Sequence, residues 1–402
     1  MSKAFGRPLA PRRGCVHSGL AELGGRLSQP EIAIVIGTRP EAIKLAPVIH
    51  ALDRAAARPV VMLTGQHPGL VLTEHGLGAV RATPLRESGL PDPLEHVDRV
   101  AQALARAWRM HSPDLVLVQG DTSSALGGAR AAAALGLPLG HVEAGLRTHD
   151  PAQPWPEEGF RVEIDALADL LFAPTAVSAA NLRSEGCGGD IHVTGNTAID
   201  ALLAAGALAP RPRRRFARRA APLKLVVTCH RRESWGAGFT RVAEALIALA
   251  ADDTAQVDAL LHPNPAVSEA IALLLGGIPG IRLLPALSHA AMLDAMRGAD
   301  LLLSDSGGVQ EEAPALGIPL LVLRDKTERP EAIACGNMRL VGTRTARIVA
   351  EVRRLANDRV ALAAMARPAL PYGDGHAAPR IAALSLDWLA GRGSLGFRVL
   401  SA

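Results

Sequence analysis

Residues 31–52, EIAIVIGTRPEAIKLAPVIHAL, contain a short apolar segment that passes through one glycine into a helical pattern. The apolar segment Ile32–Ile36 is continuous rather than alternating, which is typical of a strand buried on both faces of a parallel sheet. Gly37 permits a tight turn, and Pro40 suits the first turn of a helix. We therefore expect a strand, a turn and a helix over Glu41–Leu52.

The same alternation continues along both halves of the chain. In the first half the expected strands are Val60–Leu63, Leu115–Val118, Leu139–Val142 and Leu170–Phe172, and the expected helices include Leu94–Met110 and Ala125–Leu135. In the second half the expected strands are Leu223–Thr228, Ala259–Leu261, Arg282–Leu284, Leu301–Leu303 and Leu320–Leu323. Buried strands that alternate with helices predict an α/β fold of doubly wound parallel sheets.

Residues 210–222, PRPRRRFARRAAP, interrupt this alternation. Proline and like charges disfavour packing, so we expect an exposed linker. The chain is thus divided into a flexible basic tail (1–30), an N-terminal Rossmann-like domain (31–209), the Arg/Pro linker (210–222), a C-terminal Rossmann-like domain (223–370) and a final helix (371–391). Two such domains predict a ligand cleft between them, lined by loops at the carboxyl ends of the strands.

The charge of the chain is unevenly distributed. Of the 402 residues, 49% are hydrophobic and 20% are charged, as in an ordinary globular protein, and the net charge is +4. Residues 1–30 contribute +4 and residues 211–219 contribute +6, so the remainder is acidic, at −6. Four Trp, one Tyr and six Phe give few side chains that could stack on bases. We therefore expect no nucleic-acid partner.

Other partner and cofactor classes are disfavoured too. No apolar run reaches the ~18 residues of a membrane span, and no apolar segment follows the basic tail as a secretory signal requires. The four cysteines, Cys15, Cys187, Cys229 and Cys335, form no CxxC pair, which argues against a disulfide framework or a zinc site. No histidine stands at ligand spacing from another ligand. We expect a cytoplasmic protein without metal or membrane contact.

Three carboxylates follow successive elements of the first half. Asp121 and Glu143 each end an apolar strand, and Glu157 follows in PWPEE. Because parallel strands end at the same edge of a sheet, these groups are expected to converge, and their pKa values could separate as general acid and base catalysis requires. Two simpler interpretations stay open: Asp121 could cap a helix, and the carboxylates could pair with Arg147 and Arg161.

Possible anion sites occur in both halves. The helix start at residues 37–44 offers free amides beside Arg39 and Lys44. In the second half His230 follows a strand in TCHRRE (228–233), and Ser306–Gly308 opens a helix with Glu312 one turn later. Serine and glycine at a helix start can cradle phosphate, and a carboxylate there could bind ribose hydroxyls. These features predict a nucleotide-like ligand, although solvated surface charges would look similar.

Taken together, the motifs resemble those of the non-hydrolysing UDP-N-acetylglucosamine 2-epimerases. They are GTRPEAIK (37–44), GDTSS (120–124), HVEAGLRT (141–148), PWPEE (154–158), GNTAIDAL (195–202), HRRES (230–234), DSGGVQEEAPALG (305–317), RDKTERPE (324–331) and PYGDG (371–375). The resemblance implies a glycosyltransferase-B-like fold whose final helix crosses back to the first domain. It also implies a homodimer that interconverts UDP-GlcNAc and UDP-ManNAc, without metal or NAD, for surface polysaccharide synthesis.

The resemblance assigns roles residue by residue. Asp121, Glu143 and Glu157 resemble the acid/base carboxylates around the sugar, and His230 resembles the group that assists UDP departure. The positions similar to the family's substrate-binding residues are Arg39, Lys44, Leu287, Met292, Ser306, Gly307, Gly308, Glu312 and Arg329. The family often has an aromatic residue where Met292 stands near the uracil, and methionine packs a ring less specifically.

The sequence is also compatible with a regulatory site and with three alternative functions. In bacterial members a second UDP-GlcNAc can act as activator, and Gln66, His67, Arg231 and His262 resemble residues of that site. The nearest rival is a hydrolysing 2-epimerase, which releases ManNAc and UDP, and the next is a glycosyltransferase of similar fold. A binding protein that uses the basic tail and linker on RNA or membranes is the third.

Overall fold

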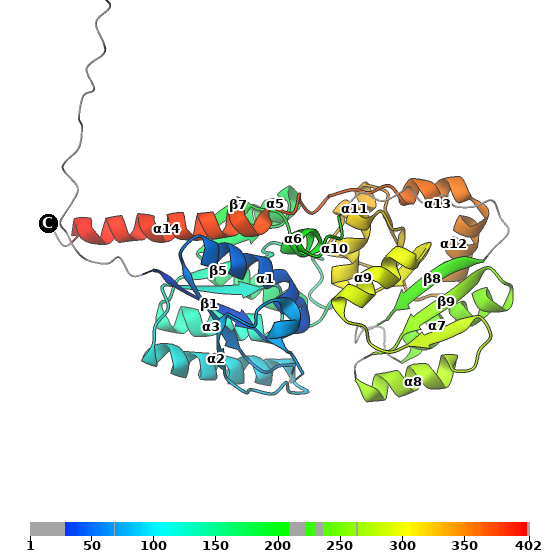
Figure 1. Ribbon diagram of the computed structural model, residues 1–402, viewed down its shortest axis with the longest axis horizontal. Helices are drawn as coiled ribbons and strands as arrows, with labels where there is room; N and C mark the ends of the chain where they lie inside the picture. Colours follow the sequence, from blue (N-terminus) through cyan, green and yellow to red (C-terminus); the bar gives the residue numbers. More distant parts are fainter. Residues whose placement is uncertain (1–28, 68, 209–221, 230–235, 263, 400–402) are drawn as a thin grey trace, which may run out of the picture.

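The computed structural model describes residues 29–67, 69–208, 222–229, 236–262 and 264–399. The basic tail up to residue 28, nearly all of the Arg/Pro linker, and His230 and Arg231 lie outside these ranges. Within them the chain forms two parallel sheets, each covered by helices on both faces, and the two units stand side by side (Figure 1). The predicted doubly wound α/β fold is confirmed.

The first sheet has seven parallel strands. From one edge to the other they are β3 (Arg81–Pro84), β2 (Arg58–Leu63), β1 (Glu31–Ile36), β4 (Leu115–Gln119), β5 (Leu139–Val142), β6 (Leu170–Ala173) and β7 (Asp190–Val193). The helices of this domain are α1 (Arg39–Arg54), α2 (Pro93–Met110), α3 (Ser123–Leu135), α4 (Glu157–Leu167), α5 (Ala176–Ser184) and α6 (Thr197–Ala204), with a 3-10 turn at Leu72–His75.

β1 shows why its sequence is continuously apolar, because all six of its residues are buried. Ala33 and Val35 pack on one face with α2, α3, α4 and α5. Ile32, Ile34 and Ile36 pack on the other face, with α1 and the last helix of the chain. A strand with a helical layer on each side has no polar face, and therefore no alternation.

The second sheet has six parallel strands. Their order is β10 (Ile281–Leu284), β9 (Ala255–Leu260), β8 (Leu223–Thr228), β11 (Leu301–Ser304), β12 (Leu320–Val322) and β13 (Met338–Leu340). The helices that follow along the chain are α7 (Ala237–Ala251), α8 (Pro265–Leu275), α9 (His289–Gly298), α10 (Gly307–Leu316), α11 (Glu331–Ala334), α12 (Thr345–Asn357), α13 (Arg359–Met365) and α14 (Ala377–Val399). α7, α12 and α13 cover one face, and α9 and α10 the other.

The chain returns to the first domain through α14, which lies along α1 (Figure 1). The carboxylate of Asp200 in α6 accepts hydrogen bonds from the amides of Ala377 and Ala378, at 3.1 and 2.8 Å, and so caps the start of α14. Just before it, Gly373 runs so close to Gly195 that a Cβ on Gly373 would lie 2.9 Å from the Cα of Gly195. Two of the quoted motifs, GNTAIDAL and PYGDG, therefore meet each other where the return segment passes α6.

Three strands were not expected from the sequence, namely β3, β7 and β13. Each lies at an edge of its sheet, and β3 and β7 have largely exposed or half-buried residues. β9 begins at Ala255, earlier than predicted. Its first residues alternate between buried and more exposed positions, so they do not form the continuous apolar run on which the prediction relied. None of the helices in the described ranges combines the length and apolar content of a membrane span.

Candidate active site

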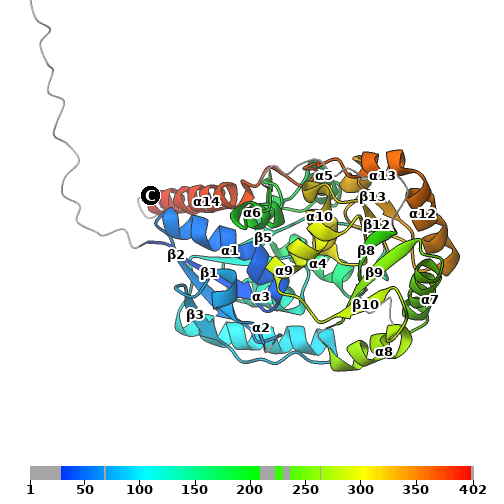
Figure 2. The same cartoon turned by 45° about the vertical axis from the view of Figure 1, so that its right-hand side comes forward.

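In the two-domain arrangement that Figure 2 shows, α1, α4 and the loop after β5 of the first domain contact α10 and the loop after β12 of the second. Asp121 follows β4, Glu143 follows β5, and Arg329 follows β12. The site therefore lies between the domains, at the carboxyl ends of the strands, where doubly wound folds bind their ligands.

Four buried charged side chains form a closed ring across this interface, which we call the interdomain ring: Lys44, Glu143, Glu311 and Arg329. The Lys44 ammonium lies 2.6 Å from Oε2 of Glu143 and 2.8 Å from Oε2 of Glu311. The Arg329 guanidinium lies 3.0 Å from Oε1 of Glu143 and 2.7 Å from Oε1 of Glu311. Each domain supplies one cation and one carboxylate, so charges of opposite sign alternate around the ring.

The members of the ring titrate differently because their surroundings differ. Burial, together with the negative charge of Glu311, raises the pKa of Glu143 above its usual value. Burial alone would also raise the pKa of Glu311, but Lys44 and Arg329 lower it. The pKa of Lys44 is raised, because Glu143 and Glu311 outweigh the cost of burying its charge. Two carboxylates with pKa values pushed apart are what general acid and base catalysis uses.

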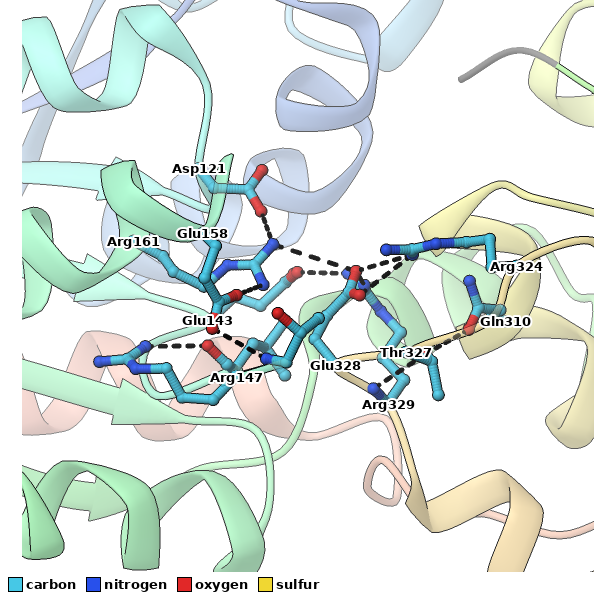
Figure 3. Close-up of polar contacts among 12 residues, drawn as sticks. Asp121, Glu143, Arg147, Glu158, Arg161, Gln310, Arg324, Thr327, Glu328 and Arg329 are labelled. Atoms are coloured by element: carbon cyan, nitrogen blue, oxygen red, sulfur yellow. Dashed lines mark hydrogen bonds and ion pairs between the residues drawn. The ribbon is translucent and has the colours of Figure 1, made fainter. Parts of the chain in front are cut away.

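A second series of ion pairs joins Asp121 to the ring (Figure 3). The Arg161 guanidinium pairs with Asp121, lies 2.7 Å from Glu158, and comes within 4.0 Å of Glu328 from the second domain. Glu328 pairs in turn with Arg329 of the ring. Asp121 and Glu143 are therefore connected through three charged side chains, Arg161, Glu328 and Arg329, and the convergence of the three carboxylates stays a prediction.

The backbone around Glu143 is held in an uncommon conformation. Glu143 has a φ of 72°, in the left-handed region that non-glycine residues rarely adopt. Its amide and that of Ala144 both donate to the carbonyl of Phe172 at 3.1 Å, and Gln119 donates to its carboxylate at 3.0 Å. The local fold thus fixes the direction of the carboxylate, as is common at functional sites.

A second buried polar cluster supports the loops that carry Asp121 and Glu143, and we call it the His141 network: His141, Arg147, Asp165 and Glu185. Nε2 of His141 lies 2.8 Å from the carbonyl of Gly120, next to Asp121, and must donate to it because a carbonyl oxygen only accepts. Nδ1 lies 2.6 Å from Asp165, whose other oxygen accepts from the amide of Gly145. Arg147 completes the network, 2.7 Å from Asp165 and 2.6 Å from Glu185.

The start of α1 differs from the sequence-based expectation. The carboxylate of Glu41 accepts hydrogen bonds from the amides of Gly37 and Thr38, at 2.9 and 2.6 Å, so these amides are not free for an external anion. The other oxygen of Glu41 accepts from the Thr122 hydroxyl at 2.6 Å, which joins this loop to the one that carries Asp121. Glu41 forms a capping box, a feature that the SxxE-like spacing from Thr38 could have indicated.

The predicted nucleotide-binding residues lie on both sides of the interface. Ser306 caps α10, and Gly307 and Gly308 form its first turn. Glu312 in α10 lies 2.8 Å from His289, the first residue of α9. Across the interface the Arg39 guanidinium donates to the carbonyl of Leu287 at 3.2 Å.

A cavity of about 470 Å³ adjoins these residues. It lies between α1, α6 and the start of α9, and its lining includes Arg39, Ser288, His289 and Leu293. Met292 lies on α9 and is half-buried against the core of the second domain. The volume falls in the range of pockets that hold small molecules.

The residues predicted for a regulatory site are only partly described. The side chain of Gln66 accepts from the amide and hydroxyl of Ser124, at 3.2 and 2.7 Å, and so supports the start of α3. His67 lies near Arg39 and His262, and loss of solvent contact together with these two charges lowers its pKa. Arg231, and likewise the predicted catalytic His230, lie outside the described residues.

Glu157 is the first residue of α4 and is half-buried. The next residue, Glu158, was not singled out from the sequence. Its carboxylate accepts hydrogen bonds from the amides of Thr148 and His149, both at 2.9 Å, and forms an ion pair with Arg161. Glu311 and Glu328 were missed as well, although both stand inside quoted motifs. In the described part of the chain no cluster of three or more His, Cys, Asp or Glu side chains is arranged to hold a metal ion.

Comparison with known proteins identifies the family. The model of the UDP-N-acetylglucosamine 2-epimerase family matches residues 50–385. The chain belongs to this family. It is 40% identical to the UDP-N-acetylglucosamine 2-epimerase of Salmonella typhimurium and 42% identical to that of Yersinia pestis, in each case over 366 residues that cover 87% of this chain and 97% of the relative.

A solved structure of the family supports the same assignment. The UDP-GlcNAc 2-epimerase of Neisseria meningitidis, crystallised with UDP-GlcNAc, is 35% identical and superposes with a TM-score of 0.81 over 89% of this chain and 100% of that one. The resemblance seen in the motifs is thereby confirmed as family membership, and the fold of this 2-epimerase family is the one described above.

Proposed function

We propose that the protein is a UDP-GlcNAc 2-epimerase of the non-hydrolysing type, which converts UDP-GlcNAc reversibly to UDP-ManNAc. The observation that carries the proposal is the interdomain ring, which places Glu143, a carboxylate of raised pKa, between the two domains of a family member. A carboxylate whose pKa is raised is a stronger base, which suits proton transfer at a sugar carbon.

The reaction needs two proton transfers and one leaving group. A carboxylate takes the proton from C2 while the bond between C1 and the UDP oxygen breaks, and the electron pair of that bond leaves with UDP. This gives a 2-acetamidoglucal with a double bond between C1 and C2. A second group then delivers a proton to C2 from the opposite face, and the UDP oxygen re-forms its bond to C1. Asp121, Glu143 and Glu157 are the proposed proton carriers.

Holding UDP between the two steps separates epimerisation from hydrolysis. Gly307 and Gly308 form the first turn of helix α10, where the helix dipole favours phosphate. Arg39, Lys44 and Arg329 are proposed to contact UDP as well, with the charges of Lys44 and Arg329 balanced inside the ring by Glu143 and Glu311. His230 is proposed to assist UDP departure. Glu312 is proposed to bind ribose, because a carboxylate accepts from two hydroxyls. Burial of the ring excludes water, which favours return of UDP over attack by water.

Incubation of the protein with UDP-GlcNAc in D2O, followed by NMR, tests the proposal. We expect UDP-ManNAc that carries deuterium at C2, with little free UDP. Stoichiometric ManNAc and UDP would instead assign the protein to the hydrolysing class. Absence of deuterium at C2 would exclude 2-epimerase chemistry of either kind.

The working state of the enzyme is part of the same proposal. We propose a homodimer that acts in the cytoplasm, by analogy with the family, and light scattering during gel filtration measures the subunit number. Turnover that survives removal of residues 1–28 and neutralisation of the arginines at 211–219 would leave these basic segments at most an accessory role.

A further inference from the structure

Glu311 is the one member of the interdomain ring to which the reaction gives no role. It lies in α10, is 0% exposed, and comes from the domain opposite to Glu143. A buried carboxylate is costly unless it is paired, and replacing such pairs by apolar residues is often neutral for stability. Its presence beside a catalytic group therefore invites a functional explanation.

Glu311 forms ion pairs with both cations of the ring, Lys44 and Arg329, and so competes with Glu143 for them. The Lys44 ammonium contacts Glu311 at 3.0 and 2.8 Å and Glu143 at 2.6 Å. Nε of Arg329 contacts Glu311 at 2.7 Å, while Nη2 of the same guanidinium contacts Glu143 at 3.0 Å. Each cation is thus shared between two carboxylates. Without Glu311, Glu143 would be the only ring carboxylate left to pair with Lys44 and Arg329.

Three elements present charged groups to Glu143: α1 presents Lys44, α10 presents Glu311, and the loop after β12 presents Arg329. Behind Arg329 stands Glu328, which takes part of the guanidinium charge through Nη1. The cations favour the ionised form of Glu143, and Glu311 opposes them. The balance is assembled from both domains, so it exists only while the domains are together.

We propose that Glu311 is a positioning residue for epimerisation: by sharing Lys44 and Arg329 with Glu143, it keeps Glu143 able to take up and release a proton when the domains close. This inference rests on the proposed function and deepens it. Opposite charges within ~4–6 Å shift a carboxyl pKa down by 1–3 units, so a Glu143 left alone with two cations would be held as a carboxylate. A carboxylate held in this way is a weak base and cannot serve as an acid near neutral pH.

The test is the pH dependence of turnover in Glu311→Gln. The amide keeps the shape but removes the charge, so we expect the limb of the kcat profile that reports Glu143 to move to lower pH by about one unit or more, with about a tenfold loss of kcat at neutral pH. Glu351→Gln is the matched control. That carboxylate pairs with Arg354 at 2.8 Å on α12, so removing its charge leaves turnover and its pH profile unchanged.

Glu311→Asp gives a second measurement that also serves if the amide variant does not fold. It keeps the charge but draws it away from both cations, so the same limb is expected to move in the same direction by a smaller amount. A profile in which kcat falls without any movement of the limb, or an unchanged kcat and profile, would overturn the inference. Failure of the wild type to exchange C2 would contradict the proposed function itself, so the two failures are distinguishable.

Discussion

The interdomain ring and the His141 network are both buried clusters of charged side chains in the same part of the molecule, but they are built differently. The ring takes Lys44 and Glu143 from one domain and Glu311 and Arg329 from the other. All members of the His141 network, in contrast, come from the first domain, and three of its bonds go to backbone atoms, those of Gly120, Gly145 and Leu146.

The difference separates two uses of buried charge. The His141 network holds the loops that carry Asp121 and Glu143, and it persists whenever the first domain is folded. The ring depends on contact between the domains, and its carboxylates have pKa values shifted in opposite directions. Charge in the network therefore fixes geometry, whereas charge in the ring tunes proton transfer.

The largest expected effect comes from Glu143→Gln in the ring. Loss of a general acid or base typically costs 10²–10⁴ in rate, so we expect kcat to fall by at least about a hundredfold. Glu311 remains to pair with both cations, so the variant should still fold. Asp121→Asn and Glu157→Gln are expected to behave alike. Turnover close to that of the wild type in all three variants would refute the proposed roles.

The second largest effect is expected on stability, from Asp165→Asn in the His141 network. Breaking a buried pair leaves Arg147 and His141 poorly compensated, which costs about 3–5 kcal/mol of unfolding free energy. Urea unfolding measures this cost. Glu185→Gln is the control within the same network, because Glu185 is partly exposed and its loss should cost less than about 1 kcal/mol. Equal losses of unfolding free energy in Asp165→Asn and Glu185→Gln would contradict the prediction that the more buried carboxylate contributes more.

A third test uses pH, because the two clusters should respond with opposite signs. Glu143 has a pKa raised above its usual 4.5, so its contribution to unfolding free energy is lost as the pH rises through the folded-state pKa. Burial would raise the pKa of Asp165, but His141 and Arg147 lower it below 3.8, so its contribution is present above 3.8 and lost as the pH falls through the folded-state pKa.

Urea unfolding over a pH series checks these signs. The stability difference between wild type and Glu143→Gln should shrink as the pH rises above 4.5, whereas the difference between wild type and Asp165→Asn should shrink below 3.8. Differences that change in the same direction would contradict the contrast between the clusters.

The smallest effect is expected at an exposed contact between the domains. Lys326 lies 2.7 Å from Asp150, with 49% and 24% of the two side chains exposed. Water screens such a pair, so its contribution is small. For Lys326→Ala we expect KM for UDP-GlcNAc to rise less than about fivefold, with kcat unchanged, and the effect to vanish at high salt. An effect as large as that of Glu311→Gln would show that burial is not what distinguishes the ring.

The fold could be predicted where strands are buried on both faces. β1 and β4 give continuous apolar runs, because helices cover them on each side. β3 and β7 could not be found in this way, because an edge strand has one neighbour and its residues are largely exposed. Their pairing is decided by the adjacent strand rather than by their own sequence.

The site could be predicted only as far as residue type and strand ends allow. Asp121 and Glu143 were singled out because a carboxylate at the end of an apolar strand is unusual. Glu311 and Glu328 were not, because a charged residue in a helix or loop is ordinary until the opposite domain covers it. Contacts between residues 267 and 186 positions apart, as in Lys44 to Glu311 and Glu143 to Arg329, would have required knowledge of how the domains pack.

The meeting of Gly195 with Gly373 has a consequence for how the two halves of the ring are held together. The second domain is an insertion into the first, since the chain enters it after α6 and comes back past the start of the same helix. Any separation of the domains would therefore be a unimolecular motion about one edge. A short tether of this kind holds separated partners at an effective concentration in the millimolar range. Glu311 and Arg329 would thus meet Lys44 and Glu143 again without a diffusional search.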